Sequence, residues 1–519
     1  MNLATTPVTN ESTLPSTIHT ISEAMAFWAA RTPDAPALRA IDGKTWSHRE
    51  LLELLGDVAD RLAAYGIGRD DRVALVVPPG IDAAIALLGT MNAAVAVPLN
   101  HRSTFHEFSR DLRRLSPKLV ITDDRTTTGL DVATTLGFRT AAARDLMVRN
   151  GDRPPTNAQL PHPDDIAIIL HTSGTTEEPK RVPRPHRTYV AAARESQAMT
   201  NLTPHDVGIL LASLHTNAGV GNLLASLLSG GSCVVAPGAD YDLVPAWLAD
   251  HRPTWFVSTP TEITRIMDAA DAAGRDRVVE PDSRLRAIRL GAQPLIPGTI
   301  ERAEQSFAAL VFDGYGMTEA SYITGGGPGA HDRRDGTCGR PVSTSIRVLD
   351  ECDRELPAGI AGAIVVRGPT LFSGYLDDAE TNAEVFLPGG WFRTGDLGYL
   401  DDDGFLTILG RSNELINRGG EKISPVEVDR VLQRHLAVAE AAAFAVPDPR
   451  LGEDIVAAVV LRPGATVTVR VLRRWLLRHL APTKAPRRIW VVDQLPRTAT
   501  GKVQRAILTE RFMVERGRH

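Results

Sequence analysis

Apolar runs without polar interruption alternate with helix-like segments over much of the chain. Residues 50–65 carry apolar side chains at the spacing of an amphipathic helix, whereas residues 72–77 form a short continuous apolar run before Pro-Pro-Gly. Continuous apolar strands separated by helices are typical of a parallel sheet covered on both faces. The same pattern predicts a helix at 83–91 and strands at 94–98, 119–122, 166–170, 233–235, 255–257 and 287–290.

The pattern changes after about residue 340. Short strands predicted at 346–349, 363–366 and 406–409 are separated by turn residues such as Asp401–Gly404. We therefore predict an α/β fold. It has a loose leader at 1–17, a large N-terminal domain of mostly parallel sheets covered by helices at 18–412, a small β subdomain within it at about 340–410, and a small mobile α+β C-terminal domain at 413–519.

Composition excludes some function classes. The net charge is −5 without a basic block, which argues against nucleic-acid binding and against an electrostatic hold on a membrane. No apolar run reaches membrane-spanning length, and the N-terminus lacks the features of a signal peptide. Cys233, Cys338 and Cys352 are widely separated, which predicts a reduced, cytoplasmic compartment with no structural disulfide or zinc.

Small and hydroxyl side chains follow the predicted strand at 166–170 and lead to a lysine. Such residues leave backbone N–H groups free to face an anion, and the lysine adds a point charge. The spacing is not that of a Walker A loop, and a plain turn explains the motif alone equally well. We interpret it as a candidate phosphate loop with the sequence Thr172-Ser173-Gly174-Thr175-Thr176-Glu177-Glu178-Pro179-Lys180.

Two further clusters carry aromatic, hydroxyl and carboxylate groups. In 313–319, Tyr315 can stack on a base and Glu319 can hold Mg²⁺ through oxygen, although a capped turn with a core tyrosine is the alternative. In the next cluster, Asp396 can accept hydrogen bonds from two ribose hydroxyls, and Arg411, 15 residues later, can add donors.

Two clusters near the C-terminus, 417–422 and 496–502, each place a lysine close to a glycine. Glycine allows the backbone to approach a ligand closely, although a solvated turn is the simpler explanation for either cluster alone. The chain has only six lysines against 57 − 6 = 51 arginines. A lysine beside glycine is therefore less readily explained as an incidental surface charge.

Together, in this order and spacing, the five clusters resemble the adenylate-forming superfamily of acyl-CoA synthetases, carrier-linked adenylation domains and beetle luciferases. The resemblance runs from about residue 18 to the C-terminus. The segments 414–425 and 498–505 are most similar to the acyl-CoA synthetase branch, and within it they most resemble the sequence pattern of oxalyl- and coumaroyl-type ligases.

The resemblance implies two half-reactions. A carboxylate attacks the α-phosphate of ATP, which gives acyl-AMP and pyrophosphate, and a thiol, usually that of CoA, then displaces AMP. The small C-terminal domain rotates about a hinge between these steps. The implied ligands are ATP or acyl-AMP, CoA, Mg²⁺ and a carboxylic acid.

The resemblance also implies which residues contact the nucleotide. The phosphates would meet the loop residues Thr172, Ser173, Gly174, Thr175, Thr176 and Lys180. The adenine would lie against Gly291, Ala292, Tyr315 and Gly316, and the ribose would be held by Asp396 and Arg411.

Catalytic and mobile positions follow from the same resemblance. Thr318 would lie near the α-phosphate, Glu319 would bind Mg²⁺, and His215 would stand beside the acyl carboxylate unless it is a core histidine. Lys502 would bridge the carboxylate and the α-phosphate, where a cation neutralises two approaching anions. Asn413 occupies the hinge position, or else is an ordinary linker residue; Gly420 would border the pantetheine tunnel, and Lys422 would contact the cofactor.

The phosphate loop departs from the pattern of the family. Glu177 and Arg181 replace glycines, and Glu178 fills the variable position. A carboxylate about 5 Å from a phosphate charge costs roughly 3 kcal/mol at an effective dielectric near 20, and Glu or Arg also disfavours positive φ. We hypothesise that adenylation is weak or lost, and that the enzyme converts an acyl-adenylate supplied by a partner ligase. In the alternative, both carboxylates point into solvent while Arg181, Arg184 and Arg187 restore positive potential.

The acid and the acceptor are less determined. Small residues around the expected pocket predict room for a bulky, apolar acid: Ala218, Gly219, Gly291, Ala292 and 325–327. A stand-alone adenylation enzyme that loads a carrier protein and a non-catalytic acyl-adenylate or acyl-CoA binding protein are the alternatives, whereas a luciferase-like oxygenase is improbable. The oligomeric state stays open, and a dimer is compatible with the sequence.

Overall fold

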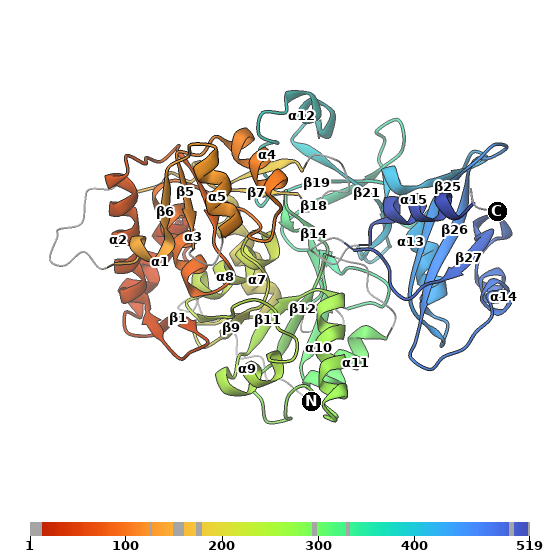
Figure 1. The fold of residues 1–519 in the computed structure, drawn as a ribbon, viewed down its shortest axis with the longest axis horizontal. Coiled ribbons are helices and arrows are strands. Elements are labelled where there is room, and N and C mark those ends of the chain that lie inside the picture. Colours follow the sequence, from red (N-terminus) through yellow and green to blue (C-terminus); the bar gives the residue numbers. More distant parts are fainter. Residues whose placement is uncertain are drawn as a thin grey trace.

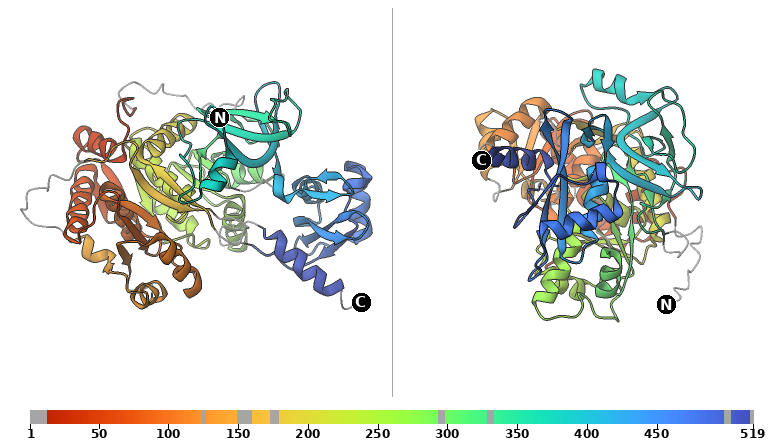
Figure 2. Two further views of the ribbon diagram at one scale, coloured as in Figure 1. Left: turned by 90° about the horizontal axis from the view of Figure 1, so that it is seen from above. Right: turned by 90° about the vertical axis from the view of Figure 1, so that its right-hand side faces the viewer.

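A computed structural model describes residues 13–123, 127–148, 160–172, 179–292, 298–327, 333–497 and 503–516 of the chain. Its N-terminal part contains two large, mostly parallel sheets with helices packed around them, and a smaller lobe containing the C-terminal strands and helices lies beside it (Figures 1 and 2). The predicted α/β class, with a small C-terminal α+β part, is confirmed. The boundary at residue 412 stays a prediction.

The first sheet has the strand order β6-β5-β3-β4-β7-β8. Its strands are parallel except β7 and β8, which are antiparallel. The return strand β8 was not predicted, because its sequence Arg-Val-Pro-Arg-Pro has no apolar run. The strands are β3 (Arg72–Val76), β4 (Val95–Pro98), β5 (Leu119–Thr122), β6 (Thr140–Ala142), β7 (Ile166–His171) and β8 (Arg181–Pro185).

The second sheet has the order β13-β12-β11-β9-β10-β1-β2, in which all neighbours are parallel except β1 and β2. The apolar runs at 233–235, 255–257 and 287–290 lie in it, as a parallel sheet requires. The strands are β1 (Pro36–Ala40), β2 (Thr45–Ser47), β9 (Val207–Leu210), β10 (Ser232–Val235), β11 (Trp255–Ser258), β12 (Ala287–Leu290) and β13 (Leu310–Asp313).

The helices of this part begin with clear sequence signals. Ser/Thr-x-x-Glu capping boxes start α1, α2, α4 and α10, so that the first backbone N–H groups are satisfied. The helices are α1 (Ile21–Arg31), α2 (His48–Ala64), α3 (Ile81–Ala93), α4 (Phe105–Leu115), α5 (Thr127–Thr135), α6 (Ala143–Leu146), α7 (His186–Thr200), α8 (Asn217–Leu228), α9 (Val244–His251), α10 (Pro260–Ala272) and α11 (Thr299–Phe307).

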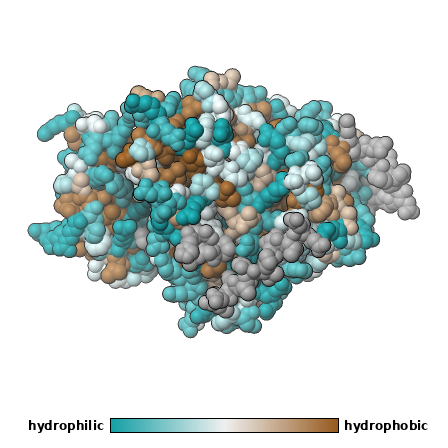
Figure 3. Space-filling model, turned by 180° about the vertical axis from the view of Figure 1, so that it is seen from behind, coloured by the Kyte–Doolittle hydropathy of each residue, from teal (hydrophilic) through white to brown (hydrophobic). Residues whose placement is uncertain are grey.

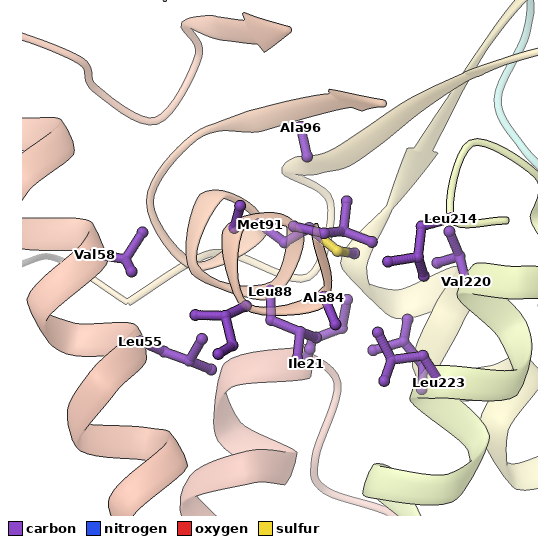
Figure 4. Packing of buried hydrophobic residues seen from close by; sticks show 14 of the residues in the cluster. Ile21, Leu55, Val58, Ala84, Leu88, Met91, Ala96, Leu214, Val220 and Leu223 are labelled. Carbon is purple, nitrogen blue, oxygen red and sulfur yellow. The ribbon is translucent and has the colours of Figure 1, made fainter. Parts of the chain in front are cut away.

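The main core lies between the two sheets, where α3 packs on the first sheet and α2 and α8 pack on the second. Figure 4 shows Leu55 and Val58 of α2 and Val220 and Leu223 of α8 on opposite sides of α3. Helices α2 and α3 approach closely, since a Cβ added at Gly89 would lie 2.4 Å from Cγ1 of Val58. Glycine at this position therefore permits the packing.

A predominantly antiparallel β subdomain follows the second sheet, as predicted. Its order is β18-β19-β21-β20, with β22 also paired to β21. Its strands and helix are β18 (Ser345–Leu349), β19 (Gly362–Arg367), α12 (Ala379–Val385), β20 (Phe386–Leu387), β21 (Trp391–Leu400) and β22 (Leu406–Arg411). Four short strands precede it: β14 (Gly316–Met317), β15 (Ser321–Tyr322), β16 (Thr324–Gly325) and β17 (Arg340–Pro341).

The C-terminal lobe (blue in Figure 1) is built on the sheet β24-β23-β26-β25, with β27 paired to β26. A hydrophobic cluster drawn only from residues from Ile416 onward gives it a core of its own. Its elements are η3 (Ser412–Glu414), β23 (Ile416–Arg418), β24 (Glu421–Ile423), α13 (Pro425–Gln433), β25 (Val438–Asp448), β26 (Gly452–Leu461), α14 (Val469–His479), η4 (Pro482–Lys484), β27 (Arg488–Val491) and α15 (Arg505–Arg516).

The surface seen from behind is mostly hydrophilic, with apolar residues in separate patches (Figure 3). Within the described ranges, none of the helices combines the length and the apolar character that crossing a bilayer requires.

Candidate functional site

The two ends of the candidate phosphate loop are fastened to each other at the edge of the first sheet. His171 pairs with Arg181 across β7 and β8. The Thr172 backbone N–H donates to the Lys180 carbonyl at 3.0 Å, and the Lys180 N–H donates to Oγ1 of Thr172 at 3.0 Å. Six of the residues between them lie outside the described residues: Ser173, Gly174, Thr175, Thr176, Glu177 and Glu178.

Arg181, which stands where the family has glycine, is an extended residue of β8 that binds other parts of the protein. Its guanidinium donates to the Arg114 and Leu376 carbonyls and to the Asp377 carboxylate, at 3.1–3.2 Å, and its side chain is only 8% exposed. The expected conflict between Arg181 and positive φ is therefore wrong, because a paired strand residue has negative φ.

Arg184 is also committed to the protein. It is fully buried and donates to the Thr318 and Thr370 carbonyls and to the Ser321 hydroxyl. The third arginine, Arg187, pairs with the exposed Asp164. The alternative in which Arg181, Arg184 and Arg187 restore positive potential at the loop stays a prediction, since these guanidinium groups bind protein acceptors but keep their charge.

Tyr315, Asp396 and Arg411 come together from three separate segments. Asp396 of β21 faces Arg411 of β22 in the strand register, with Arg411 Nε 2.8 Å from Asp396 Oδ1. The Tyr315 hydroxyl donates to the other oxygen, Oδ2. Burial lowers the pKa of Arg411, but the charges of Asp396 and its neighbours prevail, so its net pKa is raised and it stays charged.

The segment from Tyr315 to Glu319 forms a tight turn against β15. A Cβ at Gly316 would lie 2.2 Å from the Ser321 carbonyl oxygen, so this position requires glycine. The Thr318 carbonyl accepts from Arg184, and the Glu319 carbonyl accepts from the Phe372 N–H at 2.8 Å. Glu319 itself is 5% exposed. The turn therefore holds the predicted α-phosphate and metal residues in fixed positions.

Tyr375 connects the candidate phosphate loop to the cluster at 313–319, and the sequence did not predict it. Its hydroxyl donates to Glu319 Oε1 at 2.7 Å, and the Lys180 ammonium lies 4.6 Å from the centre of its ring. Burial and the Glu319 charge both raise the Tyr375 pKa, so the hydroxyl keeps its proton. The available signal was a Gly-Tyr pair after an apolar segment at 371–372.

Gly291 and Ala292 follow β12 and lie next to the Tyr315 turn. A Cβ at Gly291 would lie 3.3 Å from the Gly314 carbonyl oxygen. Ala292 has φ of +67°, a left-handed conformation that is uncommon for a residue with a side chain. Such local strain is often found at functional sites.

His215 lies in the loop between β9 and α8 and shares a small apolar cavity with His101. The cavity encloses about 20 Å³, room for about one water molecule. Burial, and then the charges of His101 and His171, lower the His215 pKa to about 4. His215 is therefore uncharged in neutral solution and would meet an acyl carboxylate as a neutral ring.

The predicted room around the small residues is wrong at two positions. A Cβ at Gly219 would lie 2.3 Å from the Ser213 carbonyl oxygen, and one at Gly325 would lie 2.5 Å from Met199 Sδ. These glycines permit close packing, so neither leaves open space for a bulky acid.

The described residues among those predicted on the C-terminal lobe are exposed. Asn413 is exposed in η3, and Gly420 is exposed in the turn between β23 and β24 with φ of +93°. Lys422 Nζ lies 2.8 Å from Glu351 Oε1. Lys502 lies outside the described residues. The structure thus brings three of the five clusters together.

The donor set at Glu319 fits a phosphate-bound Mg²⁺. This ion is usually held by one or two carboxylates together with substrate phosphates and water. Within the part of the chain that the structure describes, no group of three or more His, Cys, Asp or Glu side chains forms a cage for a metal. A single carboxylate beside a candidate phosphate loop matches this mode of binding.

Comparison with known sequences finds two matches to family profiles. The profile "AMP-binding enzyme" matches residues 25–376, and "AMP-binding enzyme C-terminal domain" matches residues 427–502. The oxalate–CoA ligase of Arabidopsis thaliana is 35% identical over 515 residues, which cover 95% of this chain and 99% of the relative.

Solved structures show the same similarity. ATP-bound MatB from Rhodopseudomonas palustris has a TM-score of 0.85 at 29% identity, with 95% of this chain and 99% of that chain covered. O-succinylbenzoate coenzyme A synthetase (MenE) from Bacillus subtilis, in complex with ATP and a magnesium ion, has a TM-score of 0.82 at 27% identity, with 93% and 98% covered.

Proposed function

The chain belongs to the family of AMP-binding enzymes and is an acid–thiol ligase of the AMP-forming type, and on that basis we propose that it makes an acyl-CoA thioester through an acyl-AMP intermediate. The single observation that carries the proposal is the assembly of Tyr315, Asp396 and Arg411 from separate segments. A buried carboxylate flanked by an aromatic ring and a guanidinium suits a ribose with its base.

Each group has a task in the proposed reaction. Asp396 accepts from the ribose hydroxyls, and Tyr315 covers one face of the adenine. Lys180 and the loop N–H groups bind phosphate oxygens. Glu319 would hold Mg²⁺, which offsets phosphate charge when bound. The neutral ring of His215 borders the acyl group, and Lys502 bridges the carboxylate and the α-phosphate.

In this proposal, the C-terminal lobe is the part of the protein that moves between the two half-reactions. Asn413, exposed in η3, is the hinge between the two half-reactions. After the lobe has turned, Gly420 borders the pantetheine arm of CoA and Lys422 contacts the cofactor. Lys422 would then leave Glu351, an exposed pair of the kind that contributes little stability.

We further propose that adenylation is the weaker half-reaction. Glu177 and Glu178 bring two carboxylates to a loop that must wrap the β- and γ-phosphates, and each costs roughly 3 kcal/mol at about 5 Å. The pairing of Arg181 with the Asp377 carboxylate supports this idea, because that guanidinium is already bound to another acidic group. Acyl-AMP lacks these two phosphates, so thioester formation is spared, and a partner ligase would supply the adenylate.

Two assays test both parts. ATP–pyrophosphate exchange is measured with a panel of acids that includes oxalate, the acid in the name of the relative from Arabidopsis thaliana, and aromatic acids. Thioester formation is measured from the matching synthetic acyl-AMP and CoA. We expect thioester formation with slow exchange. Fast exchange would contradict only the proposal of weak adenylation. Tight binding of acyl-AMP with no transfer to CoA would contradict the proposed acyl-CoA ligase activity.

A parallel reaction identifies the acceptor. CoA and a purified carrier protein that bears phosphopantetheine are offered separately to the enzyme with acyl-AMP. We expect the acyl group on CoA, and transfer to the carrier protein alone would replace the proposal with a carrier-loading enzyme.

A further inference from the structure

Tyr375 touches two charged groups that the proposed reaction needs. Its hydroxyl donates to Glu319 Oε1 at 2.7 Å, and its ring faces the Lys180 ammonium, 4.6 Å from the ring centre. Between Lys180 and Glu319, both described, the structure has no direct ion pair; each side chain meets Tyr375 instead. One aromatic residue thus lies between the phosphate-binding cation and the metal-binding carboxylate.

The segment around Tyr375 is itself tightly fixed. Asn382 of α12 accepts from the Tyr375 N–H at 2.7 Å and donates to the Tyr375 carbonyl at 2.8 Å. Gly374 has φ of +138°, and an added Cβ would lie 3.1 Å from Asn382 Oδ1. The ring packs against Phe372, with centroids 4.9 Å apart. The backbone and ring of Tyr375 therefore have little freedom.

The same segment is bonded to both neighbouring clusters through its backbone. The Phe372 N–H donates to the Glu319 carbonyl at 2.8 Å, and the Leu376 N–H donates to the Arg181 carbonyl at 3.0 Å. Arg181 in turn donates to the Leu376 carbonyl at 3.1 Å. Residues 372–376 thus connect the exit of the phosphate loop to the turn that carries Glu319.

We propose that Tyr375 is a positioning residue for the first half-reaction, which presents Lys180 and Glu319 to magnesium-bound ATP as separate, correctly placed charges. The inference rests on the proposed function. Without the ring, nothing at Tyr375 would separate the lysine from the carboxylate, and their mutual attraction would draw both charges away from the ligand. The hydroxyl fixes the carboxylate, and the ring attracts the ammonium through its π face.

Two substitutions separate the two contacts. Tyr375→Phe keeps the ring beside Lys180 and removes the hydrogen bond to Glu319, whereas Tyr375→Leu removes both contacts. The matched control is Tyr241→Phe. Tyr241 is far from Tyr375 in the sequence, and its half-buried hydroxyl contacts Arg265. Binding of Mn²⁺ with ATP is measured by electron paramagnetic resonance, so that the readout does not depend on turnover. Thermal melting checks that each variant folds.

We expect Tyr375→Phe to weaken Mn²⁺ binding in the presence of ATP by about tenfold, the usual effect of losing a hydrogen bond to a charged group. Binding of ATP without metal should change less than about threefold, because the Lys180 contact remains. Tyr375→Leu should weaken both. Thioester formation from acyl-AMP should keep its rate in Tyr375→Phe, and Tyr241→Phe should match the unsubstituted protein throughout.

The proposal is overturned if Tyr375→Phe binds Mn²⁺ and ATP like the unsubstituted protein. It is equally overturned if the affinity for ATP without metal and the affinity for Mn²⁺ with ATP fall by the same factor. It is also overturned if the unsubstituted protein binds no Mn²⁺ with ATP. In that case, thioester formation from acyl-AMP would still be measured, so the ligase assignment would stand or fall separately.

Discussion

Asp396 and Arg411 are cross-strand partners, with Arg411 Nε 2.8 Å from Asp396 Oδ1. The pair is asymmetric, because the Asp396 side chain is 6% exposed whereas that of Arg411 is 43% exposed. The Tyr315 hydroxyl reaches the second carboxylate oxygen. A carboxylate held from two sides in this way has its orientation set before a ligand arrives.

Asp396→Asn should weaken AMP binding by about tenfold to a hundredfold, because a charged acceptor is replaced by a neutral one. ATP and acyl-AMP share the ribose, so both half-reactions should slow. Calorimetric titration with AMP measures the effect. Asp353→Asn is the control, since Asp353 pairs with Arg393 on the same strand β21 at 2.6 Å, away from Tyr315. Equal AMP affinities in the two variants would remove Asp396 from the ribose site.

Arg181→Ala should lower the free energy of unfolding by about 1–3 kcal/mol, because it leaves two partly buried carbonyls without a charged donor. Arg187→Ala should change it by less than about 1 kcal/mol, since its pair with Asp164 is exposed. Urea denaturation compares them, and equal stability would contradict the anchoring role of Arg181.

The loop carboxylates are then best tested alone, by Glu177→Gly, which should raise ATP–pyrophosphate exchange while Arg181 stays in place.

The hydrophobic pattern predicted local elements well. The apolar runs at 119–122 and 287–290 are strands with those bounds, and the expected helix at 50–65 is α2. Strand order could not be predicted, because the continuous apolar runs of parallel strands carry no signal that says which strands are neighbours. The antiparallel return of β8 was missed because prolines interrupt its sequence.

The candidate site could be predicted only as separate motifs. Tyr315, Asp396 and Arg411 had recognisable surroundings, but their mutual contacts depend on tertiary packing. Tyr375 was missed because a tyrosine after glycine has no distinctive chemistry until Glu319 and Lys180 are placed beside it. The glycines at 219 and 325 were misinterpreted, because sequence does not show whether a missing side chain leaves a space or permits close packing.

Glu195 should make stability depend on pH. Burial raises its pKa to about 7, although the Ser343 hydroxyl and the charges of Arg289 and Arg184 lower it, and its Oε2 is buried with no hydrogen-bond partner among the described residues. The folded state therefore holds the proton more tightly than the unfolded state, whose pKa is ordinary, at 4.5. The free energy of unfolding should fall as pH rises from 4.5 to about 7 and then level off, by at most about 3 kcal/mol.

Glu195→Gln should remove that fall, because the amide does not titrate. Urea denaturation at about pH 5 and about pH 8 measures the difference between the two conditions. Glu384→Gln, at an exposed position of α12, should behave like the unsubstituted protein. A fall that persists in Glu195→Gln would assign the dependence to another group.

Gly420→Leu should slow the second half-reaction and spare the first. In the present arrangement a Cβ at Gly420 would meet nothing within 4 Å, so the substitution causes no clash there and only strains a backbone with φ of +93°. Gly464 is a matched control, with φ of +74° and equally open surroundings. Both variants should therefore lose similar stability, roughly 1 kcal/mol.

If the C-terminal lobe turns to bring Gly420 beside the pantetheine arm, only Gly420→Leu should slow thioester formation from acyl-AMP, by about tenfold or more, because thiol attack needs close alignment. Stopped-flow measurement of both half-reactions compares the variants, and equal rates for Gly420→Leu and Gly464→Leu would rule out that position for the arm.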